Sequence, residues 1–288
     1  MKLIASSMFL SSVSAAVDYP SSLSFLSKNL PSFDIINKES LGFATSEDID
    51  GLDDGVASVG ANISVVTRDT YPWATEEVVP DEIFLEYVLP YASVNEARTN
   101  WRPLFLEKLA PLFSDSAANA KLSTVEVVDL VNANIWSAFF NQTIVFKSSQ
   151  TPLIYDPMST IVNGFASCTG VSIMFINALR AVGVPARIAG TPAWNGIVEN
   201  GNHNWIEVWT QDGGWQFMES KPAGGGETLA NPCDKWFCSP GKMNNTRVYA
   251  ARWDQTSEMR YPMAWDVTNT AIPGVEMTDQ YQKQCGAC

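Results

Sequence analysis

Cys168 and His203 are the two residues of this chain whose types and spacing could perform chemistry together. His203 is the single histidine among 288 residues, and it lies 35 positions after Cys168. Imidazole is the side chain that titrates near neutral pH without perturbation, so any histidine-dependent proton transfer here must use His203. A thiol beside an imidazole is the arrangement of Cys–His acyl transfer. The windows 164–170 and 202–209 therefore hold the candidate chemistry.

The element that must position Cys168 is a helix. Residues 171–182 are apolar on nearly every face, which predicts a central, buried helix that Gly183 caps and Pro185 ends. At its first turn, the helix dipole and unpaired backbone N–H groups would lower the thiol pKa. Those N–H groups could also hold an oxyanion, at about 3–4 kcal/mol per donor. Spacing alone leaves two alternatives open: Cys168 as a buried free thiol, and His203 as a hydrogen-bonded strand residue.

The segments around this helix predict mixed α and β structure. Apolar residues recur at helical spacing in three segments before it, at 82–88, 101–113 and 125–140. Strands are expected after it, at 187–190, 203–210, 215–218 and 248–253, with an Asp-Gly turn inside 211–214. Helices first, then a central helix, then an antiparallel sheet define an α+β fold without internal repeats.

The composition limits the classes of function. The chain is 46% hydrophobic and carries a formal net charge of −13, without any basic run. Nucleic acid is therefore not an expected partner, because phosphate binding needs clustered lysine and arginine. The oligomeric state cannot be predicted.

The amino-terminal 16 residues resemble a signal peptide: Lys2, a modest apolar stretch at 3–13, and small residues at 14–16. No segment has the roughly 20 apolar residues of a membrane-spanning helix. We therefore expect a secreted or extracellular protein without a membrane anchor. Three Asn-x-Ser/Thr sequons, at Asn62, Asn141 and Asn244, make these residues glycosylation candidates.

Five cysteines are an odd number, and setting Cys168 aside leaves two closely spaced pairs, Cys233 with Cys238 and Cys285 with Cys288. Four cysteines can close two disulfides in three ways. We favour a clamp that ties the tail to the loop at Cys233 over the two local pairings. A zinc site of four thiolates is the alternative, but an oxidising compartment favours disulfides. We therefore expect no metal.

The motifs around Cys168 and His203 resemble the transglutaminase-like superfamily. The cysteine window is followed by a helix and the sequence Ala-Val-Gly-Val-Pro-Ala-Arg at 181–187, and 203–208 reads His-Asn-Trp-Ile-Glu-Val. Flanking motifs at 87–91, 95–96, 236–237 and 247–249 resemble a subgroup of secreted, mostly uncharacterised members. The resemblance covers about residues 80–255. It implies a papain-like core, in which helices pack on an antiparallel sheet and the nucleophilic cysteine begins the central helix.

The resemblance also implies a third catalytic residue and an oxyanion donor. The family places an aspartate a few residues after a Gly-Trp pair; here Gly214-Trp215 is followed by Glu219. A strict two-residue turn at 212–213 would place Glu219 opposite Ile206, on the wrong face of the sheet. Only a bulge or an odd-length loop would bring it to His203. The upstream Trp136 is the candidate whose indole N–H would serve the oxyanion.

These inferences predict a catalytic Cys168, His203 and Glu219 in a cysteine acyltransferase or amidohydrolase without a cofactor. The substrate would be an amide, either a protein glutamine or a peptide, attacked through a thioester. An inactive transglutaminase-like binding or structural module is the alternative. We divide the chain into a signal peptide (1–16), an acidic extension (17–79), the transglutaminase-like domain (80–255) and a cysteine-containing tail (256–288).

Overall fold

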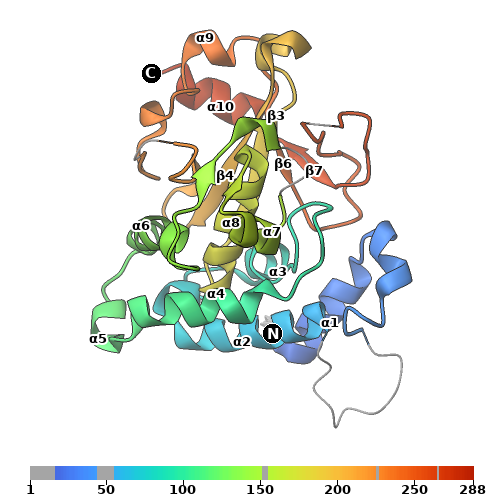
Figure 1. The fold of residues 1–288 in the computed structure, drawn as a ribbon, viewed down its shortest axis with the longest axis vertical. Helices are drawn as coiled ribbons and strands as arrows, with labels where there is room; N and C mark the ends of the chain where they lie inside the picture. The colour runs from blue at the N-terminus through green and yellow to red at the C-terminus, as the bar shows by residue number, and fades with distance from the viewer. Residues whose placement is uncertain (1–16, 44–54, 151–154, 225–226, 265) are drawn as a thin grey trace, which may run out of the picture.

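A five-stranded antiparallel sheet forms the centre of the protein (Figure 1). The computed structural model describes residues 17–43, 55–150, 155–224, 227–264 and 266–288, so the signal-peptide prediction for 1–16 lies outside the described residues. The strand order is β5-β4-β3-β6-β7. The strands are β3 (Ala186–Thr191), β4 (His203–Thr210), β5 (Gly214–Met218), β6 (Tyr249–Ala251) and β7 (Gly274–Glu276). The mixture of helices with an antiparallel sheet is the α+β class that the sequence predicts.

The loop between β4 and β5 decides which face Glu219 occupies. Thr210 pairs with Gly214 and Ile206 pairs with Met218, so the loop holds three residues, not two. Gly214 has a φ of +62°, in the left-handed region that glycine adopts without a steric penalty. The odd length places Glu219 on the same face of the sheet as Trp205 and His203, as the register argument required.

Helix α8 (Cys168–Ala181) packs against one face of the sheet, and every residue from Thr169 onward is buried. The helix ends as predicted, because Gly183 has a φ of +81° and a Cβ there would lie 2.6 Å from the Ala74 Cβ. Immediately before α8, the short strand β2 (Phe165–Ala166) pairs in parallel with β1 (Val145–Phe146). The nucleophile candidate therefore follows directly from a strand that is held in place by its neighbour.

Further helices cover α8 and the lower part of the molecule in Figure 1. The helical segments predicted at 82–88, 101–113 and 125–140 are present, the latter two finishing as 3-10 turns. The helices are α1 (Tyr19–Lys28), α2 (Val56–Thr70), α3 (Asp81–Tyr87), α4 (Trp101–Leu109), α5 (Ser116–Asn119), α6 (Thr124–Asn134), α7 (Pro157–Asn163), α9 (Pro240–Met243) and α10 (Thr278–Cys285).

Two buried arginines join α4 and α8 to the segment 87–92. The Arg102 guanidinium donates to the carbonyl of Arg180 and to those of residues 88–90, at 2.9–3.1 Å. Arg180 donates to the carbonyls of Tyr87 and Ala92, at 3.0 and 2.9 Å. Burial lowers the pKa of Arg180 to about 10, so it is still charged at neutral pH. The family-like segment 87–91 thus contributes main-chain oxygens to the core.

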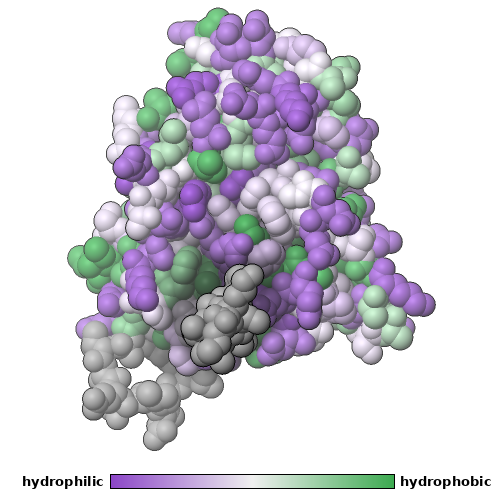
Figure 2. All heavy atoms as spheres, turned by 180° about the vertical axis from the view of Figure 1, so that it is seen from behind, coloured by the Kyte–Doolittle hydropathy of each residue, from purple (hydrophilic) through white to green (hydrophobic). Residues whose placement is uncertain are grey.

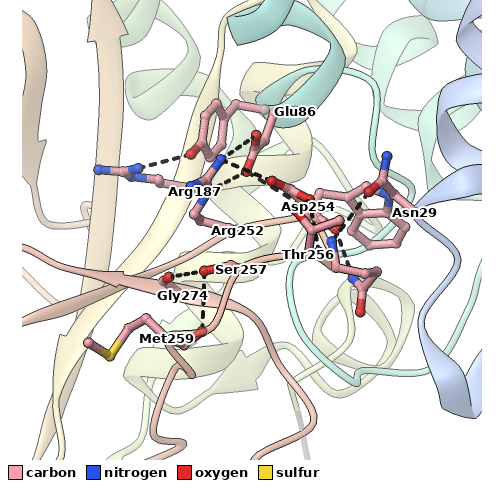
Figure 3. A network of polar contacts seen from close by, with 12 residues as sticks. Asn29, Glu86, Arg187, Arg252, Asp254, Thr256, Ser257, Met259 and Gly274 are labelled. Carbon is pink, nitrogen blue, oxygen red and sulfur yellow. Dashed lines mark hydrogen bonds and ion pairs between the residues drawn. The ribbon is translucent and has the colours of Figure 1, made fainter.

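The acidic extension before residue 80 packs onto the rest of the chain. Leu26 of α1 and Ala61 of α2 share a hydrophobic cluster with Tyr91 and Trp253. A polar network lies beside this cluster (Figure 3): Arg252 makes a two-pronged ion pair with Glu86, at 2.7 and 3.0 Å. Its continuation through Gln255 reaches the Asn29 side chain of the first helix. Residues far apart in sequence are therefore joined at this side of the fold.

The opposite face of the sheet carries an aromatic cluster backed by α10. Trp205, Phe217, Phe237 and Tyr281 pack together there, with the Trp205 and Phe237 rings stacked at 4.4 Å between centroids. Two disulfides, Cys233–Cys288 and Cys238–Cys285, connect the loop 233–238 to α10 and the tail. These two bonds tie the tail to the loop at Cys233, which is the pairing that we favour from the sequence over the two local pairings. One end of the loop is therefore attached to the last residue of α10, and the other end to the tail just beyond it.

Hydrophilic side chains cover much of the surface in Figure 2. Figure 2 shows mostly hydrophilic side chains on the face behind the view of Figure 1, with hydrophobic ones scattered among them. Among the described residues, no helix combines the length and apolar character needed to cross a bilayer. Asn62, Asn141 and Asn244 are all exposed, so each sequon asparagine is accessible.

Candidate active site

Cys168, His203 and Glu219 come together at one end of the sheet. Cys168 is the first residue of α8, His203 is the first residue of β4, and Glu219 directly follows β5. His203 Nε2 lies 2.5 Å from Glu219 Oε1, and both side chains are buried. The second ring nitrogen, Nδ1, is thereby left to form the hydrogen bond with the Cys168 thiol. The structure thus brings together the three residues that the sequence singled out.

The pKa values of the thiol and the imidazole move in opposite directions. Burial raises the pKa of Cys168, but the hydrogen bond and positive charge of His203, together with the Asn204 backbone N–H, bring it below its usual value. Burial lowers the pKa of His203, but hydrogen bonds and charge from Cys168 and Glu219 raise it to about 10. The imidazole therefore holds a shared proton more strongly than the thiol does, which favours a thiolate–imidazolium pair.

Aromatic rings surround His203. The rings of Trp194, Trp205, Trp236 and Phe237 lie 5.1–6.3 Å from it, between centroids. Trp236 also donates its indole N–H to Glu219 Oε1, at 3.0 Å. One carboxylate oxygen thus accepts from both the imidazole and the indole. These contacts restrict the orientation of the His203 ring and the Glu219 carboxylate.

A cleft of about 530 Å³ opens onto this group. Cys168 is partly exposed in it, so that a molecule in the cleft could reach the thiol. The other four cysteines are in disulfides, so Cys168 is the one free thiol, and all five positions lie in the described part of the chain. The cleft is lined by Phe146, Ser148, Cys168, Gly201, Asn202, His203, Ala223 and Trp236.

Trp136 lies in the core beside α6 and does not line this cleft. Its ring packs against Phe175 of α8, and its indole N–H donates to Asn132 Oδ1 at 3.0 Å. The same oxygen accepts the backbone N–H of Lys221, at 2.9 Å. Its role as oxyanion donor stays a prediction. In this structure, the backbone N–H groups at the start of α8 are better placed beside Cys168.

Two residues of the family-like motifs have a structural role next to the site. Arg187 and Glu207 face each other across β3 and β4 and form a fully buried ion pair of 2.6 Å. Glu207 also accepts the Tyr281 hydroxyl at 2.9 Å, and that hydroxyl accepts the Trp205 indole N–H at 2.7 Å. The motif 203–208 is thereby bonded to α10.

Trp236 belongs to the family-like flank 236–237, but nothing in the sequence assigns it a role at the site. The residue is half exposed, lies 33 positions beyond His203 and reaches Glu219 only because the disulfide-bonded loop folds back. The short spacing between Cys233 and Cys238 is the one signal in the sequence that points to a constrained loop around it. Nothing in that spacing indicates where the loop lies.

Comparisons with known proteins concern the family of this part of the chain. Residues 117–220 match the model of the transglutaminase-like superfamily, and this part of the chain belongs to that superfamily. A solved structure described as "Crystal structure of a TGase" is 16% identical, with a TM-score of 0.30. The alignment covers 46% of this chain and 35% of that one, so this chain spans about a third of its length. No curated protein matches.

Proposed function

We propose that the protein is a secreted cysteine enzyme of transglutaminase-like type, which transfers or hydrolyses the acyl group of a protein glutamine or another peptide amide. The observation that supports this most directly is the hydrogen-bonded series Cys168–His203–Glu219 at a cleft. A thiol whose pKa is lowered, next to an imidazole whose pKa is raised, is the resting state of a Cys–His nucleophile.

The first half-reaction follows from the positions of the protons. The Cys168 thiolate attacks the amide carbon and forms a C–S bond, which places negative charge on the amide oxygen. Backbone N–H groups at the start of α8 can stabilise that oxyanion. His203 then gives its proton to the leaving nitrogen as the C–N bond breaks. The products are a free amine, or ammonia from a glutamine side chain, and an acyl group held on Cys168 as a thioester.

The second half-reaction regenerates the ion pair. Neutral His203 accepts a proton from water or from an incoming amine as its oxygen or nitrogen attacks the thioester carbon. The C–S bond breaks, and the thiolate and imidazolium are restored. Water yields a carboxylic acid and an amine yields a new amide. Glu219 accepts the imidazole N–H in both steps and thereby keeps the ring oriented.

Secretion is the second part of this proposal. Two disulfides persist more readily in an oxidising compartment than in the cytosol. The exposed sequon asparagines and the signal-peptide-like residues 1–16 support the same location. Expression with residues 1–16 in a secretory host tests it. The secreted protein should begin after residue 16, and retention in the cytosol would contradict it.

Alkylation by iodoacetamide without reductant tests the nucleophile, because only one thiol is free. In the wild type, the pH midpoint of Cys168 alkylation should lie below the ordinary value of about 8.5. His203→Ala should move it to that value or above, since burial then acts without the imidazole. Asn202→Ala, which changes the cleft beside His203, is the matched control and should leave the midpoint unchanged. An ordinary thiol in the wild type would overturn the proposal and favour an inactive binding module.

Product analysis then separates the two activities. A glutamine peptide is incubated with and without a primary amine, with Cys168→Ala as the blank. Incorporation of the amine identifies a transferase, and ammonia release with a new carboxylate identifies a hydrolase. A wild type that does neither, despite an activated thiol, would contradict the glutamine substrate class.

A further inference from the structure

The residues that follow Cys168 and His203 in the sequence are bonded to each other. Asn204 Nδ2 donates to Thr169 Oγ1 at 2.8 Å, and both residues are 1% exposed or less. Thr169 belongs to the first turn of α8, and Asn204 is the second residue of β4. This single contact therefore joins the two elements that supply the thiol and the imidazole.

A third residue fixes the direction of the Asn204 amide. Tyr261 donates its hydroxyl hydrogen to Asn204 Oδ1 at 2.7 Å, and Tyr261 is also 1% exposed. Since the amide oxygen accepts from Tyr261, the amide NH₂ must point toward Thr169. Burial, together with the Cys168 and Glu207 charges, raises the pKa of Tyr261, so its hydroxyl stays a donor throughout the neutral range.

The backbone makes room for this arrangement on both sides. Gly190 of β3 pairs with Asn204, and a Cβ at that position would lie 2.3 Å from Asn204 Oδ1. Tyr261 is itself held by its backbone N–H, which donates to the Ile272 carbonyl at 2.8 Å. A Cβ on Gly274 would come within 2.8 Å of that same nitrogen. Two glycines thus allow the close approach that the hydrogen bonds need.

We infer that Tyr261 is a positioning residue, which acts through Asn204 and Thr169 to set the distance between the Cys168 thiol and the His203 imidazole. This inference rests on the proposed function, because it matters only if the thiol is activated. The Asn204 main chain, which the Tyr261–Asn204–Thr169 series orients, also directs its N–H to the Cys168 sulfur. Tyr261 thus acts on the two hydrogen bonds that the thiolate accepts, from the His203 imidazole and from the Asn204 backbone N–H, without contacting the sulfur itself.

The test compares variants that remove one hydroxyl each. Tyr261→Phe and Thr169→Val should raise the pH midpoint of Cys168 alkylation by about 0.4–1.1 units, the equivalent of one hydrogen bond. Thiolates of higher pKa are more nucleophilic, so the alkylation rate below the midpoint should fall only about 1.7- to 4-fold. Thr169→Ser retains the hydroxyl and should keep the wild-type midpoint. Tyr91→Phe is the matched control, since that buried tyrosine donates to Asp34 in the cluster with α1 and α2.

The outcomes distinguish this inference from the proposed function. If the wild-type thiol is activated and Tyr261→Phe behaves like Tyr91→Phe, the inference is overturned and the proposed function stands. If Thr169→Ser shifts the midpoint as far as Thr169→Val, the hydroxyl is not the cause and the inference is likewise overturned. A wild-type Cys168 whose alkylation midpoint lies at the ordinary value of about 8.5 overturns both the inference and the proposed function. Circular dichroism and thermal melting identify a variant that fails to fold, and the Thr169 pair then carries the test.

Discussion

The carboxylate of Glu219 should account for a measurable part of the raised His203 pKa. Glu219→Gln keeps the size of the side chain and retains an amide oxygen that can accept from the imidazole and from Trp236. It removes only the negative charge, 2.5 Å from His203 Nε2. A hydrogen bond to a charged group contributes about 1.5–3 kcal/mol, and one pKa unit equals about 1.4 kcal/mol. The His203 pKa should therefore fall by about one to two units, from about 10 to about 8–9.

The assay is an NMR titration of the imidazole resonances between pH 5 and pH 11. His203 is the only histidine, so the spectrum contains one imidazole and needs no assignment. Glu86→Gln is the control, because Glu86 is a buried carboxylate that pairs with Arg252 and belongs to a different network. An unchanged His203 pKa in Glu219→Gln, or an equal fall in Glu86→Gln, would refute the reasoning that Glu219 is the partner of His203.

Three further predictions concern stability. Above about pH 8.5 the unfolded Cys168 and His203 have both lost their protons, whereas the folded His203 keeps its proton to about pH 10. The contribution of this pair to the free energy of unfolding should therefore decrease as the pH rises from about 8.5 towards about 10, compared by urea unfolding with the Cys168→Ala, His203→Ala double variant. Glu207→Gln leaves the Arg187 charge unpaired in the core and should destabilise the fold by about 3–5 kcal/mol in the same assay, whereas a loss below 1 kcal/mol would contradict a buried pair. Replacing both cysteines of the Cys238–Cys285 disulfide by serine, which opens a loop of 47 residues, should cost up to about 4 kcal/mol, measured by thermal unfolding.

The local elements of the fold could be predicted from the sequence because their signals are local. The strand predicted at 203–210 is followed by an Asp-Gly turn signal inside 211–214, and β4 has those same bounds. The apolar run before Gly183 likewise predicts α8, although the helix begins earlier, at Cys168. The face of the sheet on which Glu219 lies depends only on whether the loop between β4 and β5 holds an even or an odd number of residues. The loop holds three.

The side-chain partners could not be predicted, because they depend on segments that meet only in the folded protein. The Trp136 indole donates to Asn132, four residues earlier in the same stretch of helix, and nothing in the spacing favours that choice over an oxyanion. Trp236 and Tyr261 reach the site through a disulfide-bonded loop and through pairing with Ile272. Such contacts have no periodicity, so a single sequence contains no pattern that reveals them.

The attachment of the loop 233–238 to α10 has a consequence for the order of events during biosynthesis. Ribosomes make Cys168 and His203 well before Cys285 and Cys288, the residues that attach the Trp236 loop. A nascent chain that has reached only Glu219 contains all three candidate catalytic residues, but neither the indole that holds the carboxylate nor the helix behind Trp205. The site is completed only when the tail has been made and oxidised. Under the proposed function, assembly of the reactive thiol would thus be coupled to arrival in a compartment where disulfides form.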